Sequence, residues 1–204
     1  DINAANGAAT LTSATGIGTG ANGAIETNVG SLTATATTGG INVAETDDVT
    51  LTNVTAGSGN VVITSGGGVD IVLMSVTGDL TLTATGDITD STTATTTVTG
   101  SANLSGASIL LGDQGGDSVN FGSLTFTSAG AVSISENSAT DLLGISTAGS
   151  LILTSTGAIN DDASASTTVT GNAAFSGTTI TIGETALDTF NAGSLTVTSA
   201  GAVI

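Results

Sequence analysis

The segment Gly122-Ser123-Leu124-Thr125-Phe126-Thr127-Ser128-Ala129-Gly130-Ala131-Val132 returns almost unchanged as Gly193-Ser194-Leu195-Thr196-Val197-Thr198-Ser199-Ala200-Gly201-Ala202-Val203. Apolar residues alternate with Thr or Ser in its first half, which places the apolar side chains on one face of a strand and the hydroxyls on the other. Thr and Val favour such a pleated, half-buried surface. The glycine that follows each run permits a tight corner. Both segments therefore predict a short β-strand that ends in a turn.

These two segments belong to a longer internal repeat. Residues 78–133 align without a gap on residues 149–204 at an offset of 71, and 31 of the 56 aligned positions are identical. We interpret residues 1–204 as a single β-solenoid repeat region, a fragment of a longer chain. Its 71-residue super-repeat is seen as 78–148 and, truncated, as 149–204.

A shorter period lies within the super-repeat. Segments of the form Gly-x-apolar-x-apolar-Thr recur at a nearly regular spacing, with longer gaps after two of them; they begin near Gly7, Gly30, Gly59, Gly78, Gly100, Gly122, Gly149, Gly171 and Gly193. A second short strand follows each corner, and a third precedes the next glycine. Three short strands and three corners in this length predict one coil of a parallel β-helix. The fold class is therefore all-β, a solenoid of about nine coils of roughly 22–23 residues.

A single coil of this kind cannot bury enough apolar surface to offset the conformational entropy that it loses, so the coils must stack on one another. Stacking places equivalent apolar residues in files that run along the core. We expect Leu80, Leu124, Leu151 and Leu195 to form a single interior file. The Thr residues between them should point outward.

Composition excludes most catalytic and binding chemistries. The chain has 17 acidic residues and a formal net charge of −17, but no Lys, Arg, His or Cys. It therefore lacks the usual zinc ligands, a thiol nucleophile, a Ser-His-Asp triad and a phosphate-binding lysine. Its charge should repel nucleic acids and anionic membranes, and no apolar run approaches the ~18 residues of a membrane span, so we expect neither nucleic-acid binding nor membrane insertion. Its mean hydropathy of +0.43 argues against disorder.

The glycine-bounded strands resemble a known group of proteins. Segments 122–132 and 193–203, together with Gly16-Ile17-Gly18, Ile25-Glu26-Thr27 and Gly40-Ile41-Asn42-Val43, are similar to the strand repeats of filamentous haemagglutinin and related two-partner or autotransporter adhesins. The resemblance covers essentially the whole chain. It implies a right-handed parallel β-helix that is secreted or held at the bacterial cell surface, as an adhesin stalk or extracellular filament.

Exposed strand edges in the first and last coils can pair with further strands. The expected partners are therefore neighbouring β-solenoid segments of the same chain or of identical chains, including end-to-end assembly into filaments.

We considered the carboxylates as catalytic or metal-binding groups. The candidate pairs are Asp47-Asp48, Asp161-Asp162, Asp87 with Asp90, and Asp113 with Asp117. No cleft or aromatic sugar platform accompanies them, so we expect no enzyme activity, no catalytic residues and no cofactor. Gly66–Ile71 and Gly112–Asp117 are similar to the Gly-Asp nonapeptide of Ca²⁺-binding β-rolls, but their spacing differs and they do not recur in consecutive coils. We therefore assign no metal site and expect only weak binding of divalent cations.

Outward Thr ladders are the alternative basis for a function. Thr-x-Thr pairs should stack on one face and form a flat hydroxyl array that resembles the ice-binding face of solenoid antifreeze proteins. The pairs are Thr33/Thr35, Thr81/Thr83, Thr125/Thr127 and Thr196/Thr198. The simpler interpretation is that these Thr residues favour strand formation and solubility and contact one another between neighbouring coils.

Overall fold

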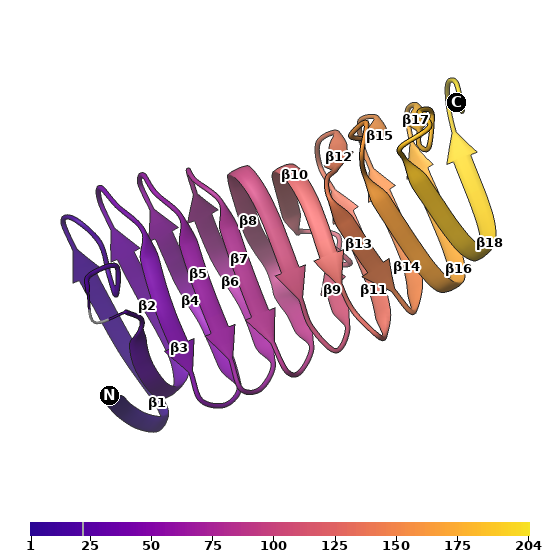
Figure 1. Cartoon of the computed structure of the whole chain (residues 1–204). Coiled ribbons are helices and arrows are strands. Elements are labelled where there is room, and N and C mark those ends of the chain that lie inside the picture. Colours follow the sequence, from indigo (N-terminus) through magenta and orange to yellow (C-terminus); the bar gives the residue numbers. More distant parts are fainter. Residues whose placement is uncertain (22) are drawn as a thin grey trace.

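The computed structural model describes residues 1–21 and 23–204 as an elongated stack of strands, with the two ends of the chain at opposite ends of the stack (Figure 1). Within residues 1–21 and 23–204, eighteen strands form one sheet, and every strand pairing within it is parallel. The described residues contain no helix, and so none that is long and apolar enough to cross a bilayer. The predicted all-β solenoid of about nine turns is confirmed.

The strands are short except where one bends around a corner and serves two sides. Their bounds are β1 Ile2–Ser13, β2 Ile25–Ala36, β3 Ile41–Glu45, β4 Val49–Ala56, β5 Val61–Ser65, β6 Val69–Val76, β7 Leu80–Ala84, β8 Ile88–Ser105, β9 Ile109–Leu111, β10 Ser118–Thr127, β11 Ala131–Glu136, β12 Thr140–Leu142, β13 Ile145–Ala148, β14 Ser150–Ser155, β15 Ile159–Asp161, β16 Ser166–Gly177, β17 Ile180–Thr181 and β18 Thr189–Ser199.

Each turn has three sides, which we call A, B and C. Side A is built from β3, β5, β7, residues 101–105 of β8, residues 123–127 of β10, β13, and the first parts of β16 and β18. Side B contains the first parts of β4, β6 and β8, then β9, β11, β14 and the last parts of β16 and β18. Side C contains the last parts of β4 and β6, residues 95–98 of β8 and residues 118–121 of β10. In later turns β12, β15 and β17 take this place along the chain, although Leu142 of β12 pairs with Leu124 on side A and not with residues 118–121.

The turns are unequal in length, and some are shorter than the predicted repeat. On side A, Ile41 pairs with Val61, and Val61 pairs in turn with Leu80 at a slightly shorter step along the sequence. The next step, from Leu80 to its partner Ala102, is longer than either. Corners absorb the difference, because parallel pairing constrains only the strands.

The core consists of apolar files that run through successive turns. Leu82, Leu104 and Phe126 pair in register on side A, and all three are fully buried. Between them the alternate residues, such as Thr83, face solvent. The predicted alternation of buried aliphatics and outward hydroxyls is therefore confirmed.

The prediction of one file for four leucines is wrong. Leu80 and Leu124 lie in a file on side A, joined through Ala102. Leu151 and Leu195 lie in a different file on side B, joined through Ala173. Leu80, Leu124 and Leu151 are buried, whereas Leu195 lies in the last turn and is partly exposed, and the two pairs do not stack on each other.

The reason is that the 71-residue super-repeat is not a whole number of turns. Its first copy begins with β7 on side A and its second begins with β14 on side B. Between these strands the chain passes ten sides, which is three full turns and one third of a turn. The longer gap from Gly122 to Gly149 has the same cause, because it spans one turn and one side.

Some corners are too tight for any side chain. Gly39 has φ of +137°, in the region that favours glycine, and a Cβ there would lie 1.7 Å from the carbonyl oxygen of Thr15 in the preceding turn. At Gly149 a Cβ would lie 2.4 Å from the carbonyl oxygen of Ala129. Glycine at these corners therefore allows the backbones of neighbouring turns to approach closely.

Truncation of one core side chain should weaken several turns at once. Leu82→Ala leaves a cavity between Leu104 and the core residues of the preceding turn, and we expect the free energy of unfolding to fall by about 2–5 kcal/mol. Urea denaturation followed by circular dichroism measures this change. Thr83→Ala, at the exposed neighbour on the same strand, is the matched control and should change it by less than about 0.5 kcal/mol. Equal losses from the two variants would contradict the assignment of inward and outward faces.

Candidate functional site

Two groups of three carboxylates stand out among the acids of the described chain. In each group, one oxygen from every carboxylate lies within 4.8 Å of the others. We call them triad 1, which is Asp90, Asp113 and Asp117, and triad 2, which is Asp161, Glu184 and Asp188.

Triad 1 joins two neighbouring turns. Asp90 ends the side-B part of β8, while Asp113 and Asp117 lie in the loop between β9 and β10 of the next turn. One Asp90 oxygen (Oδ2) accepts a hydrogen bond from the Gly112 N–H at 2.8 Å, and Asp117 accepts one from the Gln114 N–H at 2.8 Å. Asp90 is only 6% exposed, and its Oδ1 is buried without a hydrogen-bond partner in the described structure.

Triad 2 repeats this arrangement one super-repeat later. Each of its acids is the counterpart of a triad 1 acid under the same internal offset of 71. Asp161 of β15 accepts from the Gly183 N–H at 3.1 Å, and Asp188 accepts from the Thr185 N–H at 3.0 Å. Asp188 is 8% exposed, and its Oδ1, like that of Asp161, is buried without a partner among residues 1–21 and 23–204.

The glycine at the start of each acidic loop fixes the loop conformation. Gly112 and Gly183 have φ values of +71° and +72°, so both adopt the left-handed conformation. A Cβ on Gly112 would also lie 2.3 Å from the Ser135 carbonyl oxygen of the next turn. The two loops therefore share their backbone geometry as well as their acids.

Burial and mutual repulsion raise the pKa values within the triads. Burial raises the pKa of Asp90 to about 6, and the nearby charges of Asp117 and Asp113 add to this effect. Burial likewise raises the pKa of Asp161 to about 6, with contributions from Glu184 and Asp188. The N–H groups that donate to these two aspartates oppose the shift but do not cancel it.

The donor set limits what the triads can bind. The chain contains no Lys, Arg or His, so no side chain can neutralise either triad. Their negative charge can be offset only by protons or by cations from solution. Oxygen-only ligands suit hard cations such as Ca²⁺ and Mg²⁺ rather than zinc, which prefers nitrogen and sulfur.

The structure separates most of the carboxylate pairs considered from sequence. Asp87 is exposed at a corner and accepts from the Ser108 hydroxyl at 2.6 Å, whereas Asp90 is buried in triad 1. Asp162 accepts from both the N–H and the hydroxyl of Ser164, away from Asp161. Asp113 and Asp117 remain together in triad 1.

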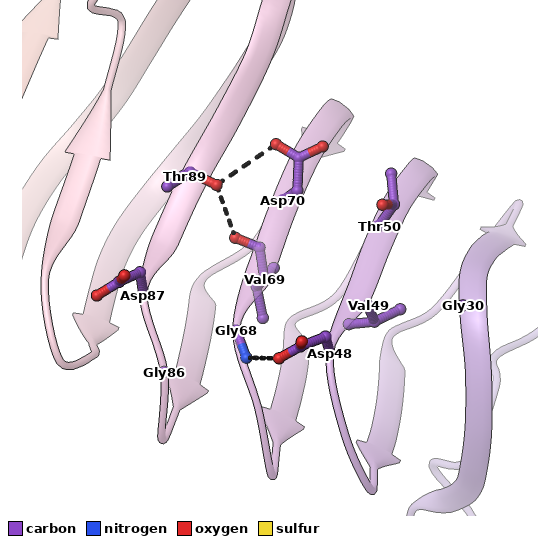
Figure 2. Close-up of a pocket in the computed structure, with 10 residues that line it drawn as sticks. All are labelled: Gly30, Asp48, Val49, Thr50, Gly68, Val69, Asp70, Gly86, Asp87 and Thr89. Carbon is purple, nitrogen blue, oxygen red and sulfur yellow. Dashed lines mark hydrogen bonds between the residues drawn. The ribbon is translucent and has the colours of Figure 1, made fainter. Parts of the chain in front are cut away.

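Asp48 lies beside a surface hollow of about 480 Å³ at the corner that leads into side B (Figure 2). Its carboxylate accepts from the Gly68 N–H at 2.7 Å, which ties one turn to the next. Asp70, on the same wall, accepts a long hydrogen bond of 3.4 Å from the Thr89 hydroxyl. Burial raises the pKa of Asp70. These carboxylates accept hydrogen bonds from a backbone N–H at a corner and from a hydroxyl on a neighbouring strand. This favours a structural role for the hollow and for the Gly66–Ile71 segment.

A further buried acid lies outside the triads. Glu136, at the end of β11, is 1% exposed and accepts from the Phe121 N–H at 3.1 Å. Its Oε1 is buried and has no partner within the described part of the chain. Burial raises the pKa of Glu136 to about 7. The signal that could have found this acid is alternation, because Glu136 follows Val132 and Ile134 on the inward face of β11.

The Thr pairs expected to form one ladder lie on three different sides. Thr33/Thr35 are on side C, Thr81/Thr83 and Thr125/Thr127 are on side A, and Thr196/Thr198 are on side B. The single array predicted from these pairs is therefore wrong. Thr125/Thr127 and Thr196/Thr198 are counterparts at the offset of 71, and the super-repeat places them on different sides.

A different array does form on side C. Two outward files cover six turns, and only Leu73 among their members lacks a hydroxyl or amide; they are Thr10, Thr33, Asn53, Leu73, Thr95 and Ser118, and beside them Thr12, Thr35, Thr55, Ser75, Thr97 and Asn120.

The fold and the repeated loops define a β-solenoid repeat protein. Residues 58–127 and 129–186 match the model of a family described as repeats of unknown function (DUF5649). These matches cover more than half of the chain, which therefore belongs to this family. Their starting residues are 71 positions apart, the same offset as the internal repeat. Comparisons with curated proteins and with solved structures found no match.

Stability should rise as the pH falls, because buried acids prefer to be protonated. The pKa of Glu136 is about 7 in the folded protein, compared with 4.5 for a glutamate exposed to solvent, as in the unfolded chain. Between these two pH values the folded protein therefore binds the proton more readily than the unfolded chain does. The free energy of unfolding therefore decreases as the pH rises from about 4.5 to 7, and the raised pKa values of Asp90 and Asp161 act in the same direction.

Glu136→Gln should remove the contribution of this group. At about pH 8 in the presence of a chelator, we expect the variant to be more stable than the parent by on the order of 1–3 kcal/mol, with a shallower pH dependence. Thermal melts between about pH 4 and pH 8 measure both effects. Glu26→Gln, at an exposed position on β2, is the control and should leave the profile unchanged. A variant less stable than the parent at about pH 8 would contradict the raised pKa.

Proposed function

We propose that this chain is a structural shaft segment of an exported bacterial surface protein, either an adhesin stalk or part of an extracellular filament. The observation that carries the proposal is the continuous stack of about nine turns, each in contact with its neighbours. In such a stack, length grows with the number of repeats while the cross-section stays constant. At ~4.8 Å per turn, nine turns span about 43 Å.

The outer surface also supports a mechanical role. Its charged side chains are all acidic, which favours solubility and disfavours contact with anionic membranes and nucleic acids. The absence of Lys and Arg also removes every cleavage site for trypsin-like proteases. Resistance to such proteases suits a protein exposed outside the cell.

Strand edges of the first and last turns are available for pairing with further turns. Side chains in the last turn that would otherwise be interior are exposed, including Leu195 at 48% and Val203 at 56%. Flanking turns of the same chain, or a second copy, would cover them. Since the chain is strongly acidic, association between copies should increase with ionic strength, which sedimentation velocity can follow.

Surface labelling tests the shaft proposal. Antibodies raised against residues 1–204 should label intact cells that express the parent protein, and protease treatment of these cells should release the epitope. An antibody against a cytoplasmic protein is the control and should label permeabilised cells only. Labelling that requires permeabilisation would contradict the proposal.

The side-C array favours a second candidate function, which is ice binding. Its two files of hydroxyl and amide groups are spaced by about 4.8 Å between turns and about 6.6 Å along each strand, so they form a regular lattice that could order water. Single ice crystals grown in the protein solution should become faceted, and Thr55→Lys, near the centre of the array, should abolish faceting. Thr83→Lys, on side A, is the control. Round crystals at high protein concentration would exclude this function.

A further inference from the structure

We propose that triads 1 and 2 are two equivalent Ca²⁺ sites, each of which joins two neighbouring turns of the solenoid. This inference does not depend on where the protein is located. It rests on the geometry of the carboxylates, on buried oxygens that lack partners, and on the recurrence of the same acids in the internal repeat.

Convergence of three carboxylates is the first observation. In both triads one acid comes from a strand and the other two from a loop in the next turn, with oxygens within 4.8 Å of one another. Like charges at this distance repel strongly, so the arrangement is unfavourable unless a cation or a proton is present. A cation held there would join the two turns through both sets of ligands.

Unpartnered oxygens are the second and independent observation. Asp90 and Asp188 are both more than nine-tenths buried, and each has an Oδ1 without a hydrogen-bond partner in the described chain. A buried carboxylate oxygen without a partner is costly. A metal ion would supply that partner, and the chain has no basic side chain that could do so.

Selective retention of the triad acids is the third observation. The aligned part of the first copy, 78–133, has five acids, of which Asp79 and Asp87 are replaced by Ser150 and Ala158 in the second copy. The three acids that keep a carboxylate are the three of triad 1. The left-handed glycine that begins each loop, Gly112 or Gly183, is kept as well.

Calcium fits this donor set better than magnesium. Ca²⁺ takes six to eight oxygen ligands with flexible geometry, which three carboxylates, loop carbonyls and water can supply. Mg²⁺ requires a near-ideal octahedron and is usually held by only one or two carboxylates. Triad 1 and triad 2 each provide three carboxylates.

Calorimetric titration with CaCl₂ of chain freed of divalent ions by a chelator tests the proposal. We expect two Ca²⁺ per chain, with Kd of about 10⁻⁴–10⁻³ M, and a rise in thermal midpoint that Mg²⁺ does not reproduce. Asp90→Asn and Asp188→Asn should each reduce the stoichiometry to one, and the double variant should reduce it to zero. Asp47→Asn, an exposed acid outside both triads, is the matched control and should keep two sites.

The behaviour of the variants without metal separates a binding defect from misfolding. With chelator present, Asp90→Asn should melt at or above the temperature of the parent, because asparagine keeps an acceptor for the Gly112 N–H and removes one repelling charge. Adding Ca²⁺ should then raise its melting temperature less than that of the parent. Titration without stoichiometric binding, or equal loss in Asp47→Asn, would show only diffuse ion association with an acidic surface and would overturn the proposal.

Discussion

Parallel pairing between successive turns is the interaction on which the rest of this structure depends. A single turn has three short strands and too few aliphatic side chains to form a core of its own. Pairing in register fills each interior file with residues from neighbouring turns, as Leu82, Leu104 and Phe126 do on side A. The same register brings glycine corners close together and places the carboxylates of adjacent turns beside one another.

Much of the fold could be predicted because its signal is local. Alternation of Leu with Thr identifies strands and their buried faces, and glycine marks the corners. The single leucine file failed because it assumed that equivalent residues of the super-repeat share a side. That assumption requires a whole number of turns in each super-repeat, and turn length depends on corners whose span alternation does not reveal.

The complete triads could not be found from short motifs, because one acid of each triad lies in the turn before the other two. Asp90 and Asp113 belong to different turns, and only stacking brings them together. Neighbouring acids such as Asp161 and Asp162 were the more visible pattern, yet the structure separates their roles. A comparison of the two copies, acid by acid, does carry the signal, since only the triad positions keep a carboxylate in both. Glu136 leaves a different trace, because it follows Val132 and Ile134 in the alternation that marks the inward face of β11.

Each super-repeat spans three full turns and one third of a turn, and this has a consequence for longer arrays of the same kind. If further super-repeats have the same length, each one places its loops one side further around the shaft than the one before. After three super-repeats, which make ten turns, the loops return to their starting side. Gain or loss of one unit would then rotate everything beyond it by a third of the circumference. Changes in repeat number would thus alter the direction in which a distal domain faces as well as its distance from the base.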